Sequence, residues 1–246
     1  MPGATFNAVP KPLAQQLIAP IMGFMISAPP LKAIHAAESR LAEAVARFVA
    51  ELGLNRSSLD AGARFAGFNE GERDLLAPNG AADIATILWR NQDAALTSDE
   101  TAQTISGMKI RDKISTLLTL RLDAGFTDEA VARRMMGFFA LPQHALLYHR
   151  LLWHTADTIW RLAGDTALDE NHYSKRIIVC GILSTAAMTR LTQGRDAQLD
   201  QISRNIQSVM AFEKFKAGIK VRPEQVMLDL AGTLGKLRFG RTETAA

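Results

Sequence analysis

Helical periodicity is the feature that most constrains the fold of this chain. From Leu31 almost to the C-terminus, apolar residues recur at intervals of three and four, and no segment sustains an alternation with a period of two. Intervals of three and four place apolar side chains on one face of an α-helix, whereas a half-buried strand needs the period of two. We therefore expect an all-α protein of about ten helices.

The first helix is expected directly after Pro29-Pro30. Gly53 is placed to end it in a left-handed cap, because glycine adopts that conformation without a steric penalty. Its predicted apolar stripe consists of Leu31, Ile34, Leu41, Val45, Phe48, Val49 and Leu52.

Three shorter helices are expected next. The second begins at Ser57 or at the residue after it. Asn69, with Glu72 three residues later, forms a capping box that opens the third, and the breaker at 78–80 ends it. The fourth is expected over 81–96.

The rest of the chain carries six longer helical patterns, whose boundaries are marked by glycines, prolines and capping residues. They are expected at about 102–123, 128–140, 143–163, 172–193, 198–217 and 224–238. We divide the chain into an extended or loosely ordered N-terminal segment, a helix-turn-helix region, a larger helical domain, and an amphipathic C-terminal helix with its tail. These parts are 1–31, 32–96, 97–222 and 223–246.

One long helix followed by two short ones, a fourth helix and a larger helical body resembles the architecture of TetR-type regulators. A DNA-reading helix needs cations that reach phosphates. The corresponding segment, 69–76, holds three acidic residues and one basic residue, and the net charge of the chain is only +3. We therefore expect a vestigial helix-turn-helix that does not bind nucleic acid; the alternative function is a TetR-type repressor with a small apolar effector.

The segment 133–176 carries a more specific pattern, because rare residue types are combined across a helix end, a loop and a helix start. The residues that carry it are Leu141, Pro142, Asp157, Trp160, Ala163, Gly164, Asp165, Asp169, Asn171, Tyr173 and Arg176. In these positions the chain resembles the lipid-binding accessory proteins of ubiquinone biosynthesis, member nine of the coenzyme Q series. Such proteins are known from mitochondria and from alphaproteobacterial relatives.

The resemblance implies a TetR-like homodimer that binds an isoprenoid lipid or a phospholipid, attaches to the surface of the inner (plasma) membrane, and presents quinone precursors to a ring hydroxylase. The residues expected to bind lipid are Met135, Phe138, Phe139, Leu147, Leu151, Arg176 and Ile182, and those expected to dock the partner are Trp160, Asp165, His172 and Tyr173. His172 and Leu162 stand where the mitochondrial members have aromatic residues. The hydroxylase could therefore be a di-iron or a flavin enzyme.

The same residues have ordinary structural explanations. The apolar side chains of the helical body could fill a core or line an adaptable cavity, and paired Met and Phe residues suit both. Asp165 and Asp169 could cap a helix start. Arg176 lies in the first turn of a helix, where a cation opposes the dipole, so it is expected to pair with Asp169 or with an anionic head group.

The predicted C-terminal helix places five apolar side chains within an arc of about 100°. They are Val226, Met227, Leu230, Leu234 and Leu237, and basic residues flank them on both sides. Burying such side chains contributes about 1.5 kcal/mol each, and each nearby cation adds about 1 kcal/mol at an anionic surface. Reversible membrane binding is one reading of this pattern, and packing on the helical body is the other.

No catalytic constellation is evident in the sequence, so the protein is expected not to be an enzyme and to need no cofactor or metal. His144, His149 and His154 are five residues apart and cannot share a helical face as zinc ligands must. Cys180, the single cysteine, lies in an apolar stretch and is expected to be inert. With no membrane-spanning stretch and no disulfide, a cytoplasmic setting is expected.

Overall fold

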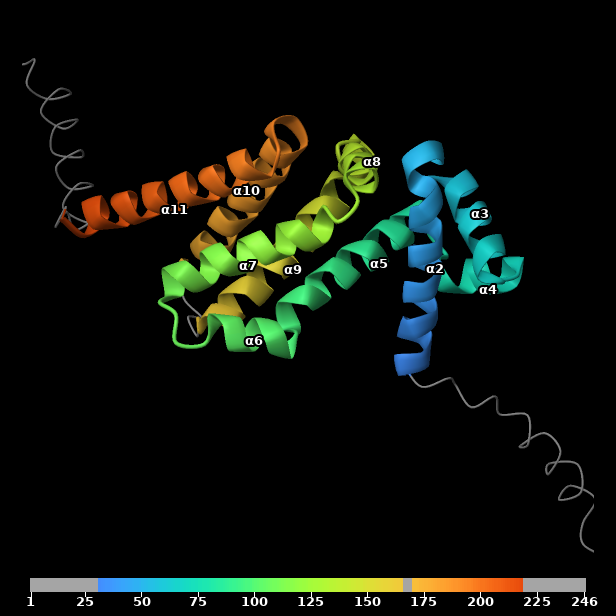
Figure 1. Ribbon diagram of the computed structural model, residues 1–246, viewed down its shortest axis with the longest axis horizontal. Coiled ribbons are helices and arrows are strands. Elements are labelled where there is room, and N and C mark those ends of the chain that lie inside the picture. The colour runs from blue at the N-terminus through green and yellow to red at the C-terminus, as the bar shows by residue number, and fades with distance from the viewer. Residues whose placement is uncertain (1–30, 166–169, 219–246) are drawn as a thin grey trace, which may run out of the picture.

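The described part of the chain is all-α, as the periodicity predicts. The computed structural model describes residues 31–165 and 170–218, and in these ranges it contains ten α-helices, two short 3-10 helices and no strand (Figure 1). The α-helices are α2 (Leu31–Leu52), α3 (Arg56–Ala66), α4 (Glu70–Leu76), α5 (Ala81–Asp93), α6 (Asp99–Ile105), α7 (Ile110–Gly125), α8 (Glu129–Phe139), α9 (Ala145–Ala163), α10 (Glu170–Gln193) and α11 (Arg195–Gly218). The 3-10 helices are Ala94–Thr97 and Pro142–His144.

The caps of the first helices follow from local sequence. Gly53 has a φ of 77° and ends α2, as predicted. The Asn69 side chain accepts a hydrogen bond from the Glu72 N–H at 2.9 Å, while Glu72 accepts one from the Asn69 N–H at 2.8 Å, so the predicted capping box is confirmed. Asn55 caps α3 in the same way, and this helix therefore begins at Arg56, slightly earlier than predicted.

The prediction of one helix over 102–123 was wrong. Two helices occupy this region, α6 and α7, and residues 106–109 separate them. Ser98 caps α6 by accepting a hydrogen bond from the Thr101 N–H at 3.2 Å, which starts the first helix earlier than expected. Gly107 has a φ of 72°, a left-handed conformation that interrupts the helical backbone.

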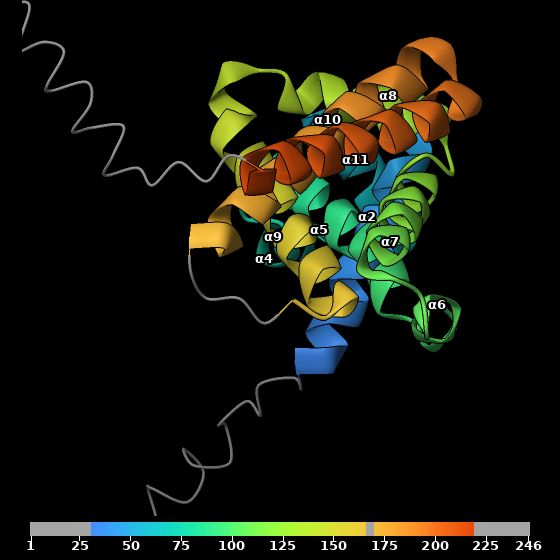
Figure 2. The same ribbon diagram turned by 90° about the vertical axis from the view of Figure 1, so that its left-hand side faces the viewer.

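The helices form two connected groups (Figure 1). Helices α2, α3 and α4 lie at one end, and α5 runs from them toward the body formed by α7, α9, α10 and α11. Helix α8 packs against both α2 and α9, and so contacts both groups. Figure 2 shows α10 and α11 side by side, in agreement with their extensive contact.

One hydrophobic core continues through both groups, across the expected boundary at 96/97. Its fully buried members include Leu41 and Val45 of α2, Ile84 of α5, Leu117 of α7 and Ile159 of α9. Within the ranges 31–165 and 170–218, none of the helices combines the length and apolar character needed to cross a bilayer.

Candidate functional site

A small apolar cavity lies where α5, α7, α8, α9 and α10 meet. Its volume is about 40 Å³, enough for a water-sized group but far less than an aromatic ring occupies. The wall includes Trp89, Phe126, Met135, Met136, Phe139, Tyr148, Leu152 and Leu183. The space among these side chains is thus small and mostly apolar.

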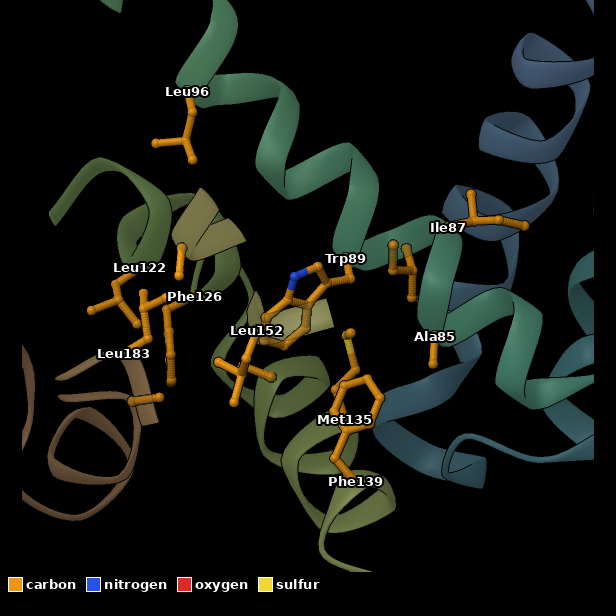
Figure 3. Packing of buried hydrophobic residues seen from close by; sticks show 14 of the residues in the cluster. Ala85, Ile87, Trp89, Leu96, Leu122, Phe126, Met135, Phe139, Leu152 and Leu183 are labelled. Atoms are coloured by element: carbon orange, nitrogen blue, oxygen red, sulfur yellow. The ribbon is translucent and has the colours of Figure 1, made fainter. Parts of the chain in front are cut away.

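Aromatic side chains form the densest part of the wall. The Trp89 ring meets Phe139 edge to face at 5.6 Å between centroids, and Tyr148 in the same manner at 5.8 Å. Phe139 and Tyr148 stack at 5.2 Å. Figure 3 shows Trp89 between Leu152 on one side and Met135 with Phe139 on the other. Edge-to-face and offset contacts of this kind add specific attraction to the burial of the rings.

A charged network borders this apolar space. The Arg121 Nε donates a hydrogen bond to Asp93, and both side chains are buried. The Thr155 hydroxyl lies 3.0 and 2.9 Å from the two Asp93 carboxylate oxygens and accepts a hydrogen bond from the Trp89 Nε1 at 2.8 Å. Burial raises the pKa of Asp93 and lowers that of Arg121, while their attraction opposes both changes.

Sequence reasoning did not single out Trp89, Asp93 and Arg121. One signal was present: Arg121 stands four residues after Leu117 and beside Leu122, within the apolar stripe of α7. A cation on a buried helical face needs a buried counterion, because an unpaired charge is costly in a low-dielectric interior. The sequence does not show that Asp93 on α5 supplies it.

The structure distributes the residues expected to bind lipid over several places. Met135 and Phe139 line the cavity. Phe138 points elsewhere, since its ring stacks on His144 at 3.8 Å, and it borders a surface hollow between α8 and the residues that follow α2. Leu147 and Leu151 line another hollow, beside α5. Ile182 is buried in the core and is not part of the cavity wall, and Arg176 is not part of it either.

Arg176 instead holds the end of α9 to the start of α10. Its side chain is 2% exposed; Nε lies 2.7 Å from Asp157 Oδ1, and Nη1 lies 3.2 Å from Asp165 Oδ2 and 3.0 Å from the carbonyl oxygen of His172. Because α10 begins at Glu170, Arg176 lies in the second turn and not in the first turn as predicted, and the two carboxylates act as its buried counterions. This favours the ion-pair alternative, with Asp157 and Asp165 as partners; Asp169 lies outside the described residues.

The residues expected to dock a partner also lie in different surroundings, from buried to exposed. The Asp165 side chain is 6% exposed and is also bound by Lys175 at 2.6 Å, so it contributes to the junction between α9 and α10. Trp160 donates a hydrogen bond from Nε1 to the Lys175 carbonyl oxygen at 2.9 Å and is half-buried. His172 is half-buried, and Tyr173 is exposed and lies near Trp153. We call Asp157, Trp160, Asp165, Lys175 and Arg176 the α9–α10 clamp.

Two side chains that the sequence allowed as core or cavity residues lie on the surface. Ile177 is 62% exposed and Met188 is 55% exposed, and with Tyr173 they share one face of α10. The opposite face, with Val179, Leu183 and Ala186, packs into the core. Cys180, between the two faces, is half-buried, and burial raises the pKa of its thiol.

The expected DNA-reading segment corresponds to α4. Arg73, its one basic residue, is buried, with Nη1 2.7 Å from Asp60 and Nε 2.9 Å from Asp74. A cation used in this way cannot reach a phosphate. Arg73 is therefore engaged within the protein, on the helix that would have to read DNA.

The family model COQ9 matches residues 147–213, from the first turn of α9 into α11. The resemblance predicted from the sequence is thereby confirmed, and the match includes the whole α9–α10 clamp as well as Tyr148, Leu152 and Leu183 of the cavity wall. COQ9 is an accessory, non-catalytic family of ubiquinone biosynthesis. No curated protein matches the chain.

Proposed function

From its COQ9 match over residues 147–213, we propose that this protein is a lipid-binding accessory protein of ubiquinone biosynthesis. It binds an isoprenoid quinone intermediate or a phospholipid at the membrane and presents it to a ring hydroxylase. The observation that carries the proposal is the overlap between the matched region and the apolar cavity, since α9 and α10 form two of its walls. Burial of apolar surface supplies the free energy that lifts such a lipid from the bilayer.

A cavity of about 40 Å³ must widen to accept any part of such a ligand. Met135 and Met136 of α8 border the cavity, and methionine side chains are unbranched and adapt readily to a changed shape. Helix α8 is also the wall that packs on α2 as well as on α9. We therefore assign the opening of the cavity to rearrangement of the α8 side chains.

The exposed face of α10 supports a role in assembly. Large exposed apolar side chains that share a helical face are typical of protein contacts. We assign Ile177 and Met188, which are more than half exposed, to a homodimer contact through α10 and α11, and Trp160, His172 and Tyr173 to the contact with the hydroxylase.

Native mass spectrometry of the protein purified from a membrane-containing host tests lipid binding directly. We expect a dimer that carries a quinone, an isoprenoid or a phospholipid, identified after extraction. A dimer that contains no lipid and that binds a palindromic DNA site in a salt-sensitive manner would replace the proposal by the repressor alternative, despite the burial of Arg73.

The membrane-binding residues Val226, Met227, Leu230, Leu234 and Leu237 lie outside the described residues, and their role is part of the proposal. Replacing Val226, Leu230 and Leu237 together by serine is expected to abolish co-sedimentation with anionic liposomes, because the apolar face of the helix is lost. The control Gln225→Ser/Asp229→Glu changes residues away from that face and should sediment like the wild type. Unchanged sedimentation of the triple variant, with an unchanged circular dichroism spectrum, would remove membrane binding through this helix.

A further inference from the structure

Arg121 carries a buried donor that the described residues do not satisfy. Its side chain is 4% exposed, and its Nε is used by Asp93. Among the described residues, none accepts a hydrogen bond from its Nη2, although this nitrogen is fully buried. A buried charged donor without an acceptor is costly, and native structures retain few of them. The unused Nη2 therefore points to an acceptor from outside the described residues.

The position of Arg121 supports the same conclusion. Its guanidinium carbon lies 4.5 Å from the centroid of the Trp89 ring, and both Arg121 and Gln92 line the apolar cavity. Gly125, one turn along α7, keeps this corner open, since a Cβ there would lie 3.0 Å from Arg121 Nη1 and 3.4 Å from Gln92 Oε1. The cavity thus has a polar corner, built by Arg121, Gln92 and Gly125, and its other walls are mostly apolar.

The charge of this corner selects the kind of acceptor. Asp93 already neutralises Arg121, and the Thr155 hydroxyl lies within hydrogen-bond distance of both Asp93 oxygens. A ligand carboxylate or phosphate would bring a second negative charge close to Asp93 in a low-dielectric interior, where like charges repel strongly. A neutral oxygen can accept a hydrogen bond from Arg121 Nη2 without that repulsion.

We propose that the Arg121 corner binds a neutral carbonyl or ether oxygen at the polar end of an otherwise apolar ligand. This inference rests on the proposed lipid-binding function and specifies how the ligand is oriented. A quinone ring and an acyl ester both carry such an oxygen. The present volume of about 40 Å³ admits the oxygen, and the carbon skeleton behind it displaces the side chains of Met135 and Met136.

Binding measurements with three probes test the proposal: decylubiquinone, monoolein as the acyl ester, and dodecylbenzene, which has no oxygen. The double variant Asp93→Leu/Arg121→Met removes the corner without leaving an unpaired charge, and such apolar replacements of buried ion pairs often keep the fold. We expect the variant to bind the favoured oxygen-bearing probe at least about tenfold more weakly, because a hydrogen bond to a charged group is lost. Dodecylbenzene should bind both proteins equally.

Quenching of tryptophan fluorescence reports binding, because Trp89 lies in the cavity wall and is kept in the variant. Loss confined to decylubiquinone would assign the corner to a quinone ring, and loss confined to monoolein would assign it to an acyl ester. Equal binding of every probe by wild type and variant would overturn the role of Arg121 and leave lipid binding standing. Failure of the wild type to bind any probe would overturn both proposals.

A second variant keeps the test decisive if the double variant does not fold. Asp93→Asn preserves the shape of the side chain but leaves Arg121 without its counterion. The corner then becomes cationic, and we expect dodecanoate to bind at least about tenfold more tightly than it binds the wild type, because charge-assisted hydrogen bonds are stronger. Unchanged dodecanoate binding in a folded Asp93→Asn protein would overturn the proposal.

Discussion

Replacing Arg176 by leucine is expected to lower the free energy of unfolding by about 3–5 kcal/mol, because one partner of a buried ion pair is removed. Arg176 is 2% exposed, and the Asp165 carboxylate with which it pairs is 6% exposed. Without the guanidinium, Asp165 loses its buried cation and retains the partly exposed Lys175, and Asp157 retains the exposed Arg161. The junction between α9 and α10 then holds buried negative charge that its remaining cations do not fully neutralise.

Arg161→Leu is the matched control, because Arg161 pairs with the same Asp157 at 2.7 Å from a side chain that is 72% exposed. Exposed pairs contribute little, so this change should lower the free energy of unfolding by less than about 1 kcal/mol. Urea titration of both variants, followed by circular dichroism, measures the difference. Similar losses in the two variants would show that the buried clamp does not hold the helices together.

Gly62→Ala is expected to destabilise the protein by about 2–3 kcal/mol through overpacking. Gly62 lies in α3 where this helix crosses α2, and a Cβ there would lie 2.5 Å from the Cα of Val45 and 2.6 Å from its backbone nitrogen. Backbone atoms cannot move aside as a flexible side chain can, so α3 must shift away from α2. This cost exceeds the gain of about 1 kcal/mol that alanine normally brings to a helix.

Gly137→Ala provides the comparison, since Gly137 is also helical but a Cβ there meets nothing within 4 Å. This variant should be stabilised by up to about 1 kcal/mol, because only the helix propensity changes. Thermal unfolding of the two variants should therefore shift in opposite directions from the wild type. A Gly62→Ala protein as stable as Gly137→Ala would mean that α2 and α3 do not cross at this glycine.

The α9–α10 clamp shows what several of the residues that carry the family resemblance do in the fold. Asp157, Trp160, Asp165 and Arg176 contact one another or the backbone, and none of them lines the cavity. Any influence that they have on the cavity is therefore indirect. They fix α9 against α10, and these helices carry Tyr148, Leu152 and Leu183 to the cavity wall.

The sequence by itself determined the features that depend on residues within about one helical turn. The all-α class follows from the spacing of apolar residues, and the end of α2 at Gly53 and the capping box of Asn69 and Glu72 follow from local backbone chemistry. The split between α6 and α7 was missed, although Gly107 and the capping residue Ser98 are equally local signals. The spacing of apolar residues alone does not reveal the break between these two helices.

Only the tertiary structure decided which residues meet and which helical faces are covered. Asp93 contacts Arg121, 28 residues away, and Thr155, 62 residues away. Ile177 and Val179 are both apolar and two residues apart, yet one is exposed and the other is buried. A helical pattern marks an apolar face but does not say which neighbour covers it, because that depends on how helices distant in sequence pack against one another.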